Sequence, residues 1–278
     1  MPLIHNRYGK REVRVMRLYR AGERHEVREL TVHAMVEGDF ARTYTHADNS
    51  TSVSTDTIKN VVNVVARENL ALDNERFCKA VADKLLSSYP QIERAEISGH
   101  QTKWVRLAVG GAAHPHSFVL DANGKPFCEV HATRSAASFA SGITGYTFMK
   151  STQSGWAGYV NDRYTTIPET HDRLCATAMD ARWEWSSSPA DFTKTNDAIL
   201  ATMLEVFAMT YSASVQDSLY RMGEAALATV PELSKVSLAC PNKHYLLVNL
   251  APFGLDNENQ VFLPTDEPHG QIECTVGR

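Results

Sequence analysis

Alternation of apolar and polar residues near the N-terminus predicts two adjacent β-strands. Residues 27–38 place four apolar side chains on one face, namely Leu30, Val32, Ala34 and Val36, as expected of a half-buried strand. Residues 13–20 are equally apolar, but their alternation slips at Val15 and Met16, which indicates a bulge or burial on both faces. The link at 20–24 contains a glycine and suits a hairpin turn.

The next two segments have helical periodicity. Residues 54–70 repeat apolar side chains at i, i+3, i+4 and i+7, namely Ile58, Val61, Val62 and Val65. Thr55 or Ser54 suits the N-cap, and Asp56 is favourable near the positive end of the helix. A second helix is predicted over residues 74–89.

The rest of the chain extends this order and then repeats it. Strand patterns follow at 91–101 and 104–109, and Asn123-Gly124 predicts a β-hairpin within 116–133. In the second half, strands are predicted at 142–152 and 175–185, and helices at 191–212 and 214–230. Three closing strands follow, with the sequences KVSLAC, HYLLVNL and GQIECTV.

The chain therefore reads ββααββ twice, which predicts an α+β fold of two similar modules, 1–135 and 136–278. Connection lengths favour antiparallel pairing. Because long sheet edges are a hazard unless they are paired, a subunit of this kind would gain from ring-like assembly with other copies.

Composition narrows the function classes. A formal net charge of −4 and a pI of about 6.3 argue against general binding to nucleic acid. Five widely spread cysteines without a CxxC pair indicate a reducing compartment. No run approaches the roughly 18 apolar residues of a membrane span. The C-terminus lacks an SKL-type signal, so we expect a cytoplasmic protein, or a peroxisomal one if a C-terminal tail has been cut off.

Common cofactor and metal motifs are missing. The chain has no P-loop, GxGxxG, HExxH or nucleophile elbow. Its only close histidine pair is His114 and His116, with no third ligand at a useful spacing, so a polar loop is the simpler interpretation. We therefore expect no metal site.

Four segments could carry chemistry, and each also has an ordinary explanation. The lysine of YGKREVRV can be a solvated strand residue, and STDTIKN can be a plain helix cap. The long link at 151–174 is rich in aromatics and can pack on itself, although links of this length are often functional. The histidine of CPNKHYLL could bind a metal, relay a proton or only bond a carbonyl.

Together these segments resemble the urate oxidase (uricase) family in order and spacing, over almost the whole chain. The matching segments are YGKREVRV, GDF with ADNSTSVSTDTIKN, the 151–174 link, SASVQDSLYRM, CPNKHYLL and QIECTVGR. The resemblance implies a tandem T-fold (tunnelling fold) with helices on one face of each antiparallel sheet. It also implies a barrel-like homotetramer with active sites at subunit interfaces. The family oxidises urate with O2 and water to 5-hydroxyisourate and H2O2 in purine degradation, without metal or organic cofactor.

The resemblance also assigns substrate-binding residues. Arg173 and Gln216 match the clamp on the purine, while the backbone N–H groups of Val215 and Asp56 match two further contacts. A planar anion suits a guanidinium, which donates two parallel hydrogen bonds. The family's S-x-F-x-G-F pattern reads S-G-W-A-G-Y here, so Trp156 takes the stacking position.

The proton relay of the family matches Lys10, Thr55 and His244. A lysine whose neutral form is favoured can act as the base. Asn242 matches the residue that, with Thr55, holds O2 or the attacking water. Thr55 and Asp56 would come from a neighbouring subunit. Lys243 should point away from Asn242 and His244 on an extended strand.

Two other functions compete with this interpretation. The first is a purine- or pterin-binding T-fold protein with lost or altered oxidase activity, because Trp156 departs from the family pattern. The second is a metal-dependent T-fold enzyme of the pterin type, which the missing His/Cys ligand set disfavours.

Overall fold

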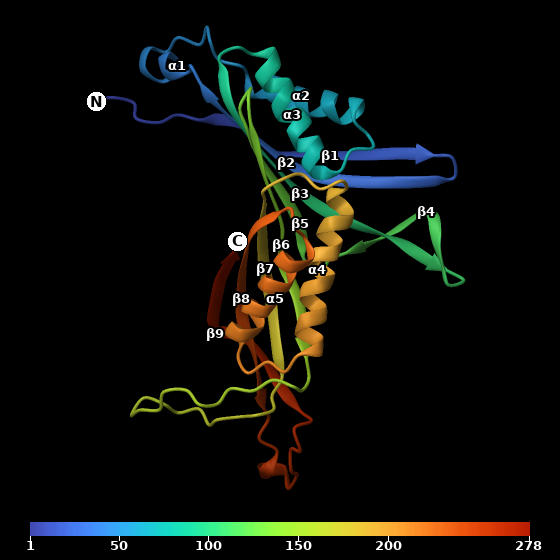
Figure 1. The fold of residues 1–278 in the computed structure, drawn as a ribbon, viewed down its shortest axis with the longest axis vertical. Helices are drawn as coiled ribbons and strands as arrows, with labels where there is room; N and C mark the ends of the chain where they lie inside the picture. Colours follow the sequence, from blue (N-terminus) through green and yellow to red (C-terminus); the bar gives the residue numbers. More distant parts are fainter. The chain divides into compact units, whose positions relative to one another are not determined.

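The computed structural model describes residues 1–278, and the chain forms two compact units (Figure 1). The first unit comprises Met1–Gly142 and Glu184–Asn196, and the second comprises Ile143–Trp183 and Asp197–Arg278. These units are defined by contacts, whereas the modules 1–135 and 136–278 are defined by the repeat of elements. The module boundary stays a prediction.

The first unit is an antiparallel sheet covered by helices. Its strands are β1 (Tyr8–Ala21), β2 (Arg24–Gly38), β3 (Ile92–Val109), β4 (Ala112–Asp121) and β5 (Lys125–Ala132), and its helices are α1 (Ala41–His46), α2 (Thr55–Glu68) and α3 (Asn74–Ser88). The strands follow the order β1-β2-β3-β5. One apolar cluster joins the sheet to α2 and α3, with fully buried members such as Val32, Val36, Ile97, Ile58, Val62, Phe77 and Leu85.

The second unit repeats this arrangement. The elements are β6 (Ala137–Lys150), β7 (Cys175–Trp185), α4 (Phe192–Met209), α5 (Val215–Thr229), β8 (Leu233–Leu247), the 3₁₀-helix η1 (Ala251–Phe253) and β9 (Phe262–Gly277). Of these, β6, β7 and α4 also extend into the first unit. The strand order is β6-β7-β8-β9, and α5 packs on β8 and β9. None of the chain's helices is both long and apolar enough to cross a membrane.

The predicted hairpin at Asn123-Gly124 is wrong. Strand β3 is long enough to pair with two partners: residues 95–100 pair with β5 and residues 103–109 pair with β4. The Asn-Gly turn therefore joins two strands that lie one after the other along β3. The hairpin is instead closed by Gly110 and Gly111, whose φ angles of 60° and 81° suit the tight turn between β3 and β4.

The expected irregularity of the first strand lies earlier than Val15-Met16. The register between β1 and β2 shifts between Lys10 and Val13, where two residues of β1 oppose one of β2. Glu12 has a φ of 58° at this bulge. The extra residue lets both Lys10 and Val13 face the helices, which alternation alone forbids.

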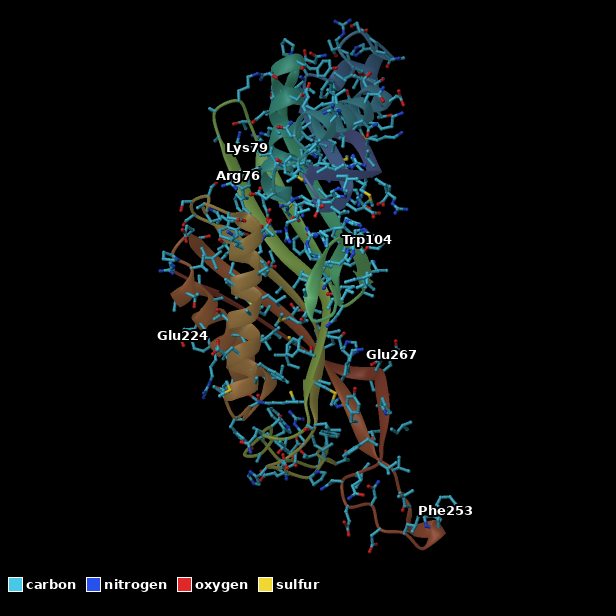
Figure 2. All side chains as sticks on the ribbon, turned by 90° about the vertical axis from the view of Figure 1, so that its right-hand side faces the viewer. Arg76, Lys79, Trp104, Glu224, Phe253 and Glu267 are labelled. Atoms are coloured by element: carbon cyan, nitrogen blue, oxygen red, sulfur yellow. The ribbon has the colours of Figure 1, made fainter.

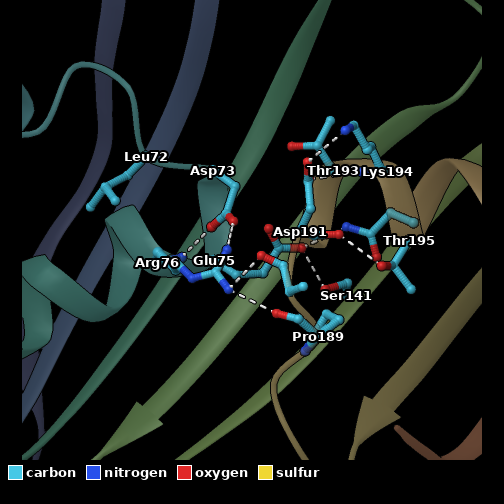
Figure 3. Close-up of polar contacts among 12 residues, drawn as sticks. Leu72, Asp73, Glu75, Arg76, Ser141, Pro189, Asp191, Thr193, Lys194 and Thr195 are labelled. Atoms are coloured by element: carbon cyan, nitrogen blue, oxygen red, sulfur yellow. Dashed lines mark hydrogen bonds and ion pairs between the residues drawn. The ribbon is translucent and has the colours of Figure 1, made fainter. Parts of the chain in front are cut away.

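A buried carboxyl group anchors the start of α3 (Figure 3). Glu75 Oε1 accepts hydrogen bonds from Ser141 Oγ at 2.6 Å and from Asn196 Nδ2 at 2.7 Å. Ser141 Oγ in turn accepts from Trp185 Nε1 at 3.0 Å. Burial raises the pKa of Glu75, and the two hydrogen bonds offset part of that effect. The ionised carboxylate at this position therefore lowers the stability of the folded chain.

We expect Glu75→Gln to stabilise the protein at neutral pH, because an amide oxygen keeps both hydrogen bonds without the buried charge. A raised folded pKa costs stability above that pKa and nothing below the unfolded value. The gain in Tm at pH 7, about 2 °C or more, should therefore vanish as the pH falls below the ordinary pKa of glutamate. Thermal unfolding from pH 4 to pH 8 measures this difference.

The matched control is Glu224→Gln on the exposed side of α5 (Figure 2). Its carboxylate stays in water, so the Tm of this variant should follow that of the parent at every pH. A destabilised Glu75→Gln variant at pH 7 would show that the charge of Glu75 stabilises the fold.

Candidate functional site

Lys10 lies next to a close approach of β1 to β2. Gly9 admits no side chain, since a Cβ there would lie 2.0 Å from the carbonyl oxygen of Ala34. Lys10 follows directly, pairs with Ala34 and precedes the bulge. Because bulges redirect side chains and are frequent beside active sites, the local structure gives Lys10 a defined direction toward the helices.

The N-terminus of α2 presents free backbone donors beside this strand. Ser54 is the N-cap, and its hydroxyl accepts from the N–H of Thr57 at 3.0 Å. Thr55 is the first helical residue, so its exposed hydroxyl has no capping role. The N–H groups of Thr55 and Asp56 have no acceptor within the helix. Such an end attracts anions and hydrogen-bond acceptors.

The side chain of Asp56 is occupied within its own helix. Its carboxylate accepts from Lys59 and, at 3.1 Å, from Asn60. The hydrogen bond from Lys59 is the main reason that the pKa of Asp56 is lowered, and the charge of Lys10 also contributes. Asp56 therefore offers its backbone N–H to a ligand, and Lys10 lies within electrostatic reach of this helix end. We call Lys10, Thr55 and Asp56 the Lys10 half-site.

A second half-site is built in the other unit from the link between β6 and β7. Trp156 N–H donates to Thr170 O at 2.7 Å, and Thr170 N–H donates back at 2.9 Å. Arg173 N–H donates to Ser154 O at 2.9 Å. This short antiparallel ladder holds Trp156 and Arg173 on neighbouring stretches of chain, so the long link is ordered by its own backbone.

The same ladder lies against the start of α5. Gly155 N–H donates to Ser212 O at 2.9 Å, two residues before the N-cap Ser214. The hydroxyl of Ser214 accepts from Asp217 N–H at 3.0 Å. The N–H groups of Val215 and Gln216 are therefore free of the helix, as those of Thr55 and Asp56 are in α2. We call Trp156, Arg173, Val215 and Gln216 the Trp156 half-site.

Trp156 has one covered face. Its ring stacks on Tyr159 with centroids 5.4 Å apart and an angle of 14° between the planes. Tyr159 is held in turn by its hydroxyl, which donates to Ile167 O at 2.7 Å. Tyr159 thus covers and supports one face of the indole, and a flat ligand would stack on the opposite face.

Arg173 carries an unsatisfied donor. Its Nε is buried and has no hydrogen-bond partner. A buried N–H of a charged group without an acceptor costs free energy. An anionic acceptor bound at the guanidinium would remove this cost, so the arginine is preorganised for a ligand.

Asn242 and His244 lie on either side of a second irregularity. Asn242 pairs with Gly270 and His244 pairs with Thr265, with a register shift between them. Lys243 donates to Asp266 Oδ1 at 3.0 Å, so its ammonium is already paired. No hydrogen bond links Asn242 or His244 to Arg173 or Gln216.

Two residues next to the Trp156 half-site, Lys150 and Tyr211, were not predicted from the sequence. Lys150 Nζ donates to Phe207 O at 3.2 Å and Thr210 O at 2.8 Å, which fixes the end of α4. Tyr211 donates to His171 O at 2.9 Å, which ties the α4–α5 connection to the ladder. The sequence signals were a lysine after an apolar strand and a tyrosine before the Ser-Ala-Ser cap.

No group of three or more His, Cys, Asp or Glu side chains is placed to hold a metal ion. His114 and His116 contact each other edge to face, with ring centroids 4.6 Å apart. The described side chains therefore offer no set of metal ligands at that pair.

Comparison with known proteins decides the family. A family model described as Uricase matches residues 6–131 and 139–273. The chain belongs to the uricase family. It is 36% identical to the uricase of Arthrobacter globiformis, over 98% of this chain and 89% of that protein. It is 35% identical to the uricase of Oryctolagus cuniculus, over 98% and 93% of the two chains.

The fold agrees with this assignment. A crystal structure of uricase from Arthrobacter globiformis superposes with a TM-score of 0.93 at 35% identity, over 100% of this chain and 95% of that chain. These matches confirm three predictions for this chain: the uricase family, the α+β tandem T-fold and the oxidoreductase class. The roles given to individual residues stay predictions.

Proposed function

We propose that this chain catalyses the oxidation of urate by O2 and water to 5-hydroxyisourate and H2O2, without a metal or organic cofactor. The observation that carries the proposal is the buried, unpaired Nε of Arg173, on a stretch of chain hydrogen-bonded to the one that carries Trp156, whose ring is backed by Tyr159. A flat anion that accepts hydrogen bonds satisfies both features at once. Membership of the uricase family supports urate as that anion.

Substrate binding follows from the Trp156 half-site. Arg173 donates two parallel hydrogen bonds to one edge of the purine, and each charge-assisted bond contributes roughly 1.5–3 kcal/mol. The amide of Gln216 donates and accepts on another edge, and the N–H of Val215 adds a donor at the N-terminus of α5. Trp156 stacks on the ring.

Proton removal is assigned to Lys10, with Thr55 and His244 completing a relay. Thr55 suits this role because Ser54 caps the helix and leaves the threonine hydroxyl unused. Thr55 and Asn242 hold O2 or the attacking water, since a hydroxyl and an amide can hydrogen-bond a water molecule without placing a net charge beside either neutral reactant. Asp56 contributes its N–H to the purine.

The two half-sites belong to different units of the chain. We propose that Thr55 and Asp56 reach the Trp156 half-site of a neighbouring subunit, in a barrel-like homotetramer with active sites at its interfaces. The cytoplasmic location expected from the sequence is likewise a proposal.

One assay tests the function. Metal-stripped protein is mixed with urate in air, and loss of the purine's ultraviolet absorbance is followed together with H2O2. Turnover without added metal is expected. Turnover that requires a metal would overturn the cofactor-free reaction. Tight purine binding without turnover would favour the second candidate function, a purine- or pterin-binding protein, for which Trp156 in the phenylalanine position is the favouring observation.

We expect Trp156→Phe to keep the KM for urate within about threefold of the parent, because an aromatic face remains for stacking. Trp156→Ala should raise KM by about tenfold, since stacking adds roughly 0.5–1.5 kcal/mol beyond area burial. Steady-state kinetics of the two variants measure this difference. Equal KM values for both variants would show that the ring at this position does not stack on the substrate.

A further inference from the structure

We propose that Tyr8 is a positioning residue that fixes the N-terminus of α2 against the strand that carries Lys10. This inference rests on the proposed function, because the relay requires Thr55 and Lys10 to keep one mutual placement. Tyr8 itself has no role in the expected catalytic set.

The hydroxyl of Tyr8 makes two hydrogen bonds to one residue. It donates to Val53 O at 2.9 Å and accepts from Val53 N–H at 2.8 Å. Val53 is buried and directly precedes Ser54, the N-cap of α2. Both backbone polar groups of Val53 are thus held by a single side chain, one residue before the cap.

The phenol ring is itself held in place. It packs edge-on against Phe40, with centroids 4.8 Å apart and planes at 82°. Phe40 is fully buried. Burial is the main reason that the pKa of Tyr8 is raised, so the hydroxyl keeps its proton and can donate to Val53 O.

Tyr8 and Lys10 lie two residues apart on β1, so both side chains face the same side of the sheet. Their partners Val36 and Ala34 are fully buried on that side, in the cluster shared with α2. The neighbouring residues of the loop are tied elsewhere: Thr51 Oγ1 donates to Asp39 O at 2.9 Å, and Gln91 donates to Thr51 O. Tyr8 is therefore the hydrogen-bonded link from the start of α2 to the Lys10 strand.

Such a link matters because small displacements are costly. A misplacement of about 1 Å can cost about 100-fold in rate. Loss of the Tyr8 hydroxyl leaves Val53 N–H and Val53 O without partners, and the loop has to shift to find water for them. That shift moves Thr55 and Asp56 relative to Lys10.

The first test is Tyr8→Phe in the full-length protein, with Tyr44→Phe as the matched control. Tyr44 lies nearby and is half exposed, and its hydroxyl makes only a 3.5 Å contact with Arg7 O. We expect Tyr8→Phe to lower kcat about tenfold, with a smaller loss of affinity for a non-reactive purine analogue. Tyr44→Phe should leave both quantities unchanged. A wild-type kcat in Tyr8→Phe would overturn the inference.

A double-mutant cycle separates positioning from a general loss of stability. If Tyr8 acts through Thr55, then Tyr8→Phe should lower kcat of the Thr55→Ala variant by less than about twofold. An undiminished tenfold effect in that background would show that Tyr8 acts on the fold and not on Thr55.

Hydrogen exchange gives a readout that does not depend on activity. The amides of Val53 and Thr57, which are hydrogen-bonded in the parent, should exchange faster in Tyr8→Phe, and those of β5 should not. Unchanged exchange at Val53 and Thr57 would refute the positioning role. If the parent protein fails to oxidise urate, the proposed function fails, while the exchange result still decides whether Tyr8 holds this helix end.

Discussion

Arg173→Met should raise the KM for urate by at least about 10- to 150-fold, which is the loss that one of its two charge-assisted hydrogen bonds, at roughly 1.5–3 kcal/mol, causes alone. The physical reason is the position of the guanidinium. Its backbone is fixed to Ser154 O at 2.9 Å, and its Nε is buried without an acceptor. The donor is therefore preorganised for an anionic acceptor, which the proposed function takes to be urate, and methionine removes it at similar volume.

The same argument predicts an unusual stability result. Because the buried Nε has no partner in the free protein, Arg173→Met removes a cost and should leave Tm equal or higher. Steady-state kinetics and thermal unfolding measure the two effects. A variant with parental KM would refute the clamp, and a fall in Tm without a change in KM would make Arg173 a purely structural residue.

Arg163→Met is the matched control, because Arg163 lies in the same link and its exposed side chain contacts Tyr164. Its KM should equal that of the parent.

Co-expression of the Arg173→Met and Thr55→Ala variants adds a test of the shared site. If each site takes Thr55 from one subunit and Arg173 from another, mixed assemblies contain some intact sites and should recover part of the activity. No recovery would place both residues in the same subunit's site.

The helices and most strands followed from local sequence. Apolar periodicity predicted residues 54–70 and 74–89, where α2 and α3 lie, and the predicted strand at 175–185 coincides with β7. These segments were predictable because one face of each element is buried, and the spacing of its apolar residues therefore matches the period of a helix or strand. Short α1 and η1 bury no residue, and for that reason their sequences carry no such pattern.

Long-range pairing was not predictable in the same way. Asn123-Gly124 is a strong local turn signal, yet which strands pair across it depends on the length of β3. The bulge after Lys10 depends on the approach of Gly9 to Ala34, a contact between separate strands. The strand pairing and the bulge both depend on the partner strand, so the sequence of one strand alone does not predict their positions.

The candidate site shows the same division. Local physics offered Ser54 or Thr55 as the cap, and only the backbone geometry assigns the cap to Ser54 and leaves the hydroxyl of Thr55 unused. The resemblance supplied Arg173, but the unpaired Nε that supports its role is a tertiary fact. Tyr8 stands beside Gly9 and Lys10 in the sequence, and its link to Val53 spans 45 positions.

Lys10→Met should lower kcat by at least about 100-fold, because general acid–base catalysis contributes typically 10²–10⁴-fold. Methionine keeps most of the length of the side chain and removes the amine, so the Gly9 approach and the bulge should persist. Affinity for a non-reactive purine analogue should change little, since none of the proposed contacts with the purine comes from the side chain of Lys10. Thr55→Ala should show the same separation of kcat from affinity.

Lys243→Met is the control for the loss of a lysine charge near the proposed relay. Lys243 lies between Asn242 and His244 in sequence, but its ammonium is paired with Asp266 at 3.0 Å. We expect its kcat to equal that of the parent, because its ammonium is already paired with Asp266 and the proposed relay does not include Lys243. Parental turnover in Lys10→Met would refute the assignment of Lys10 as the base. Equal losses of kcat in both lysine variants would mean that net positive charge, and not a placed base, drives the reaction.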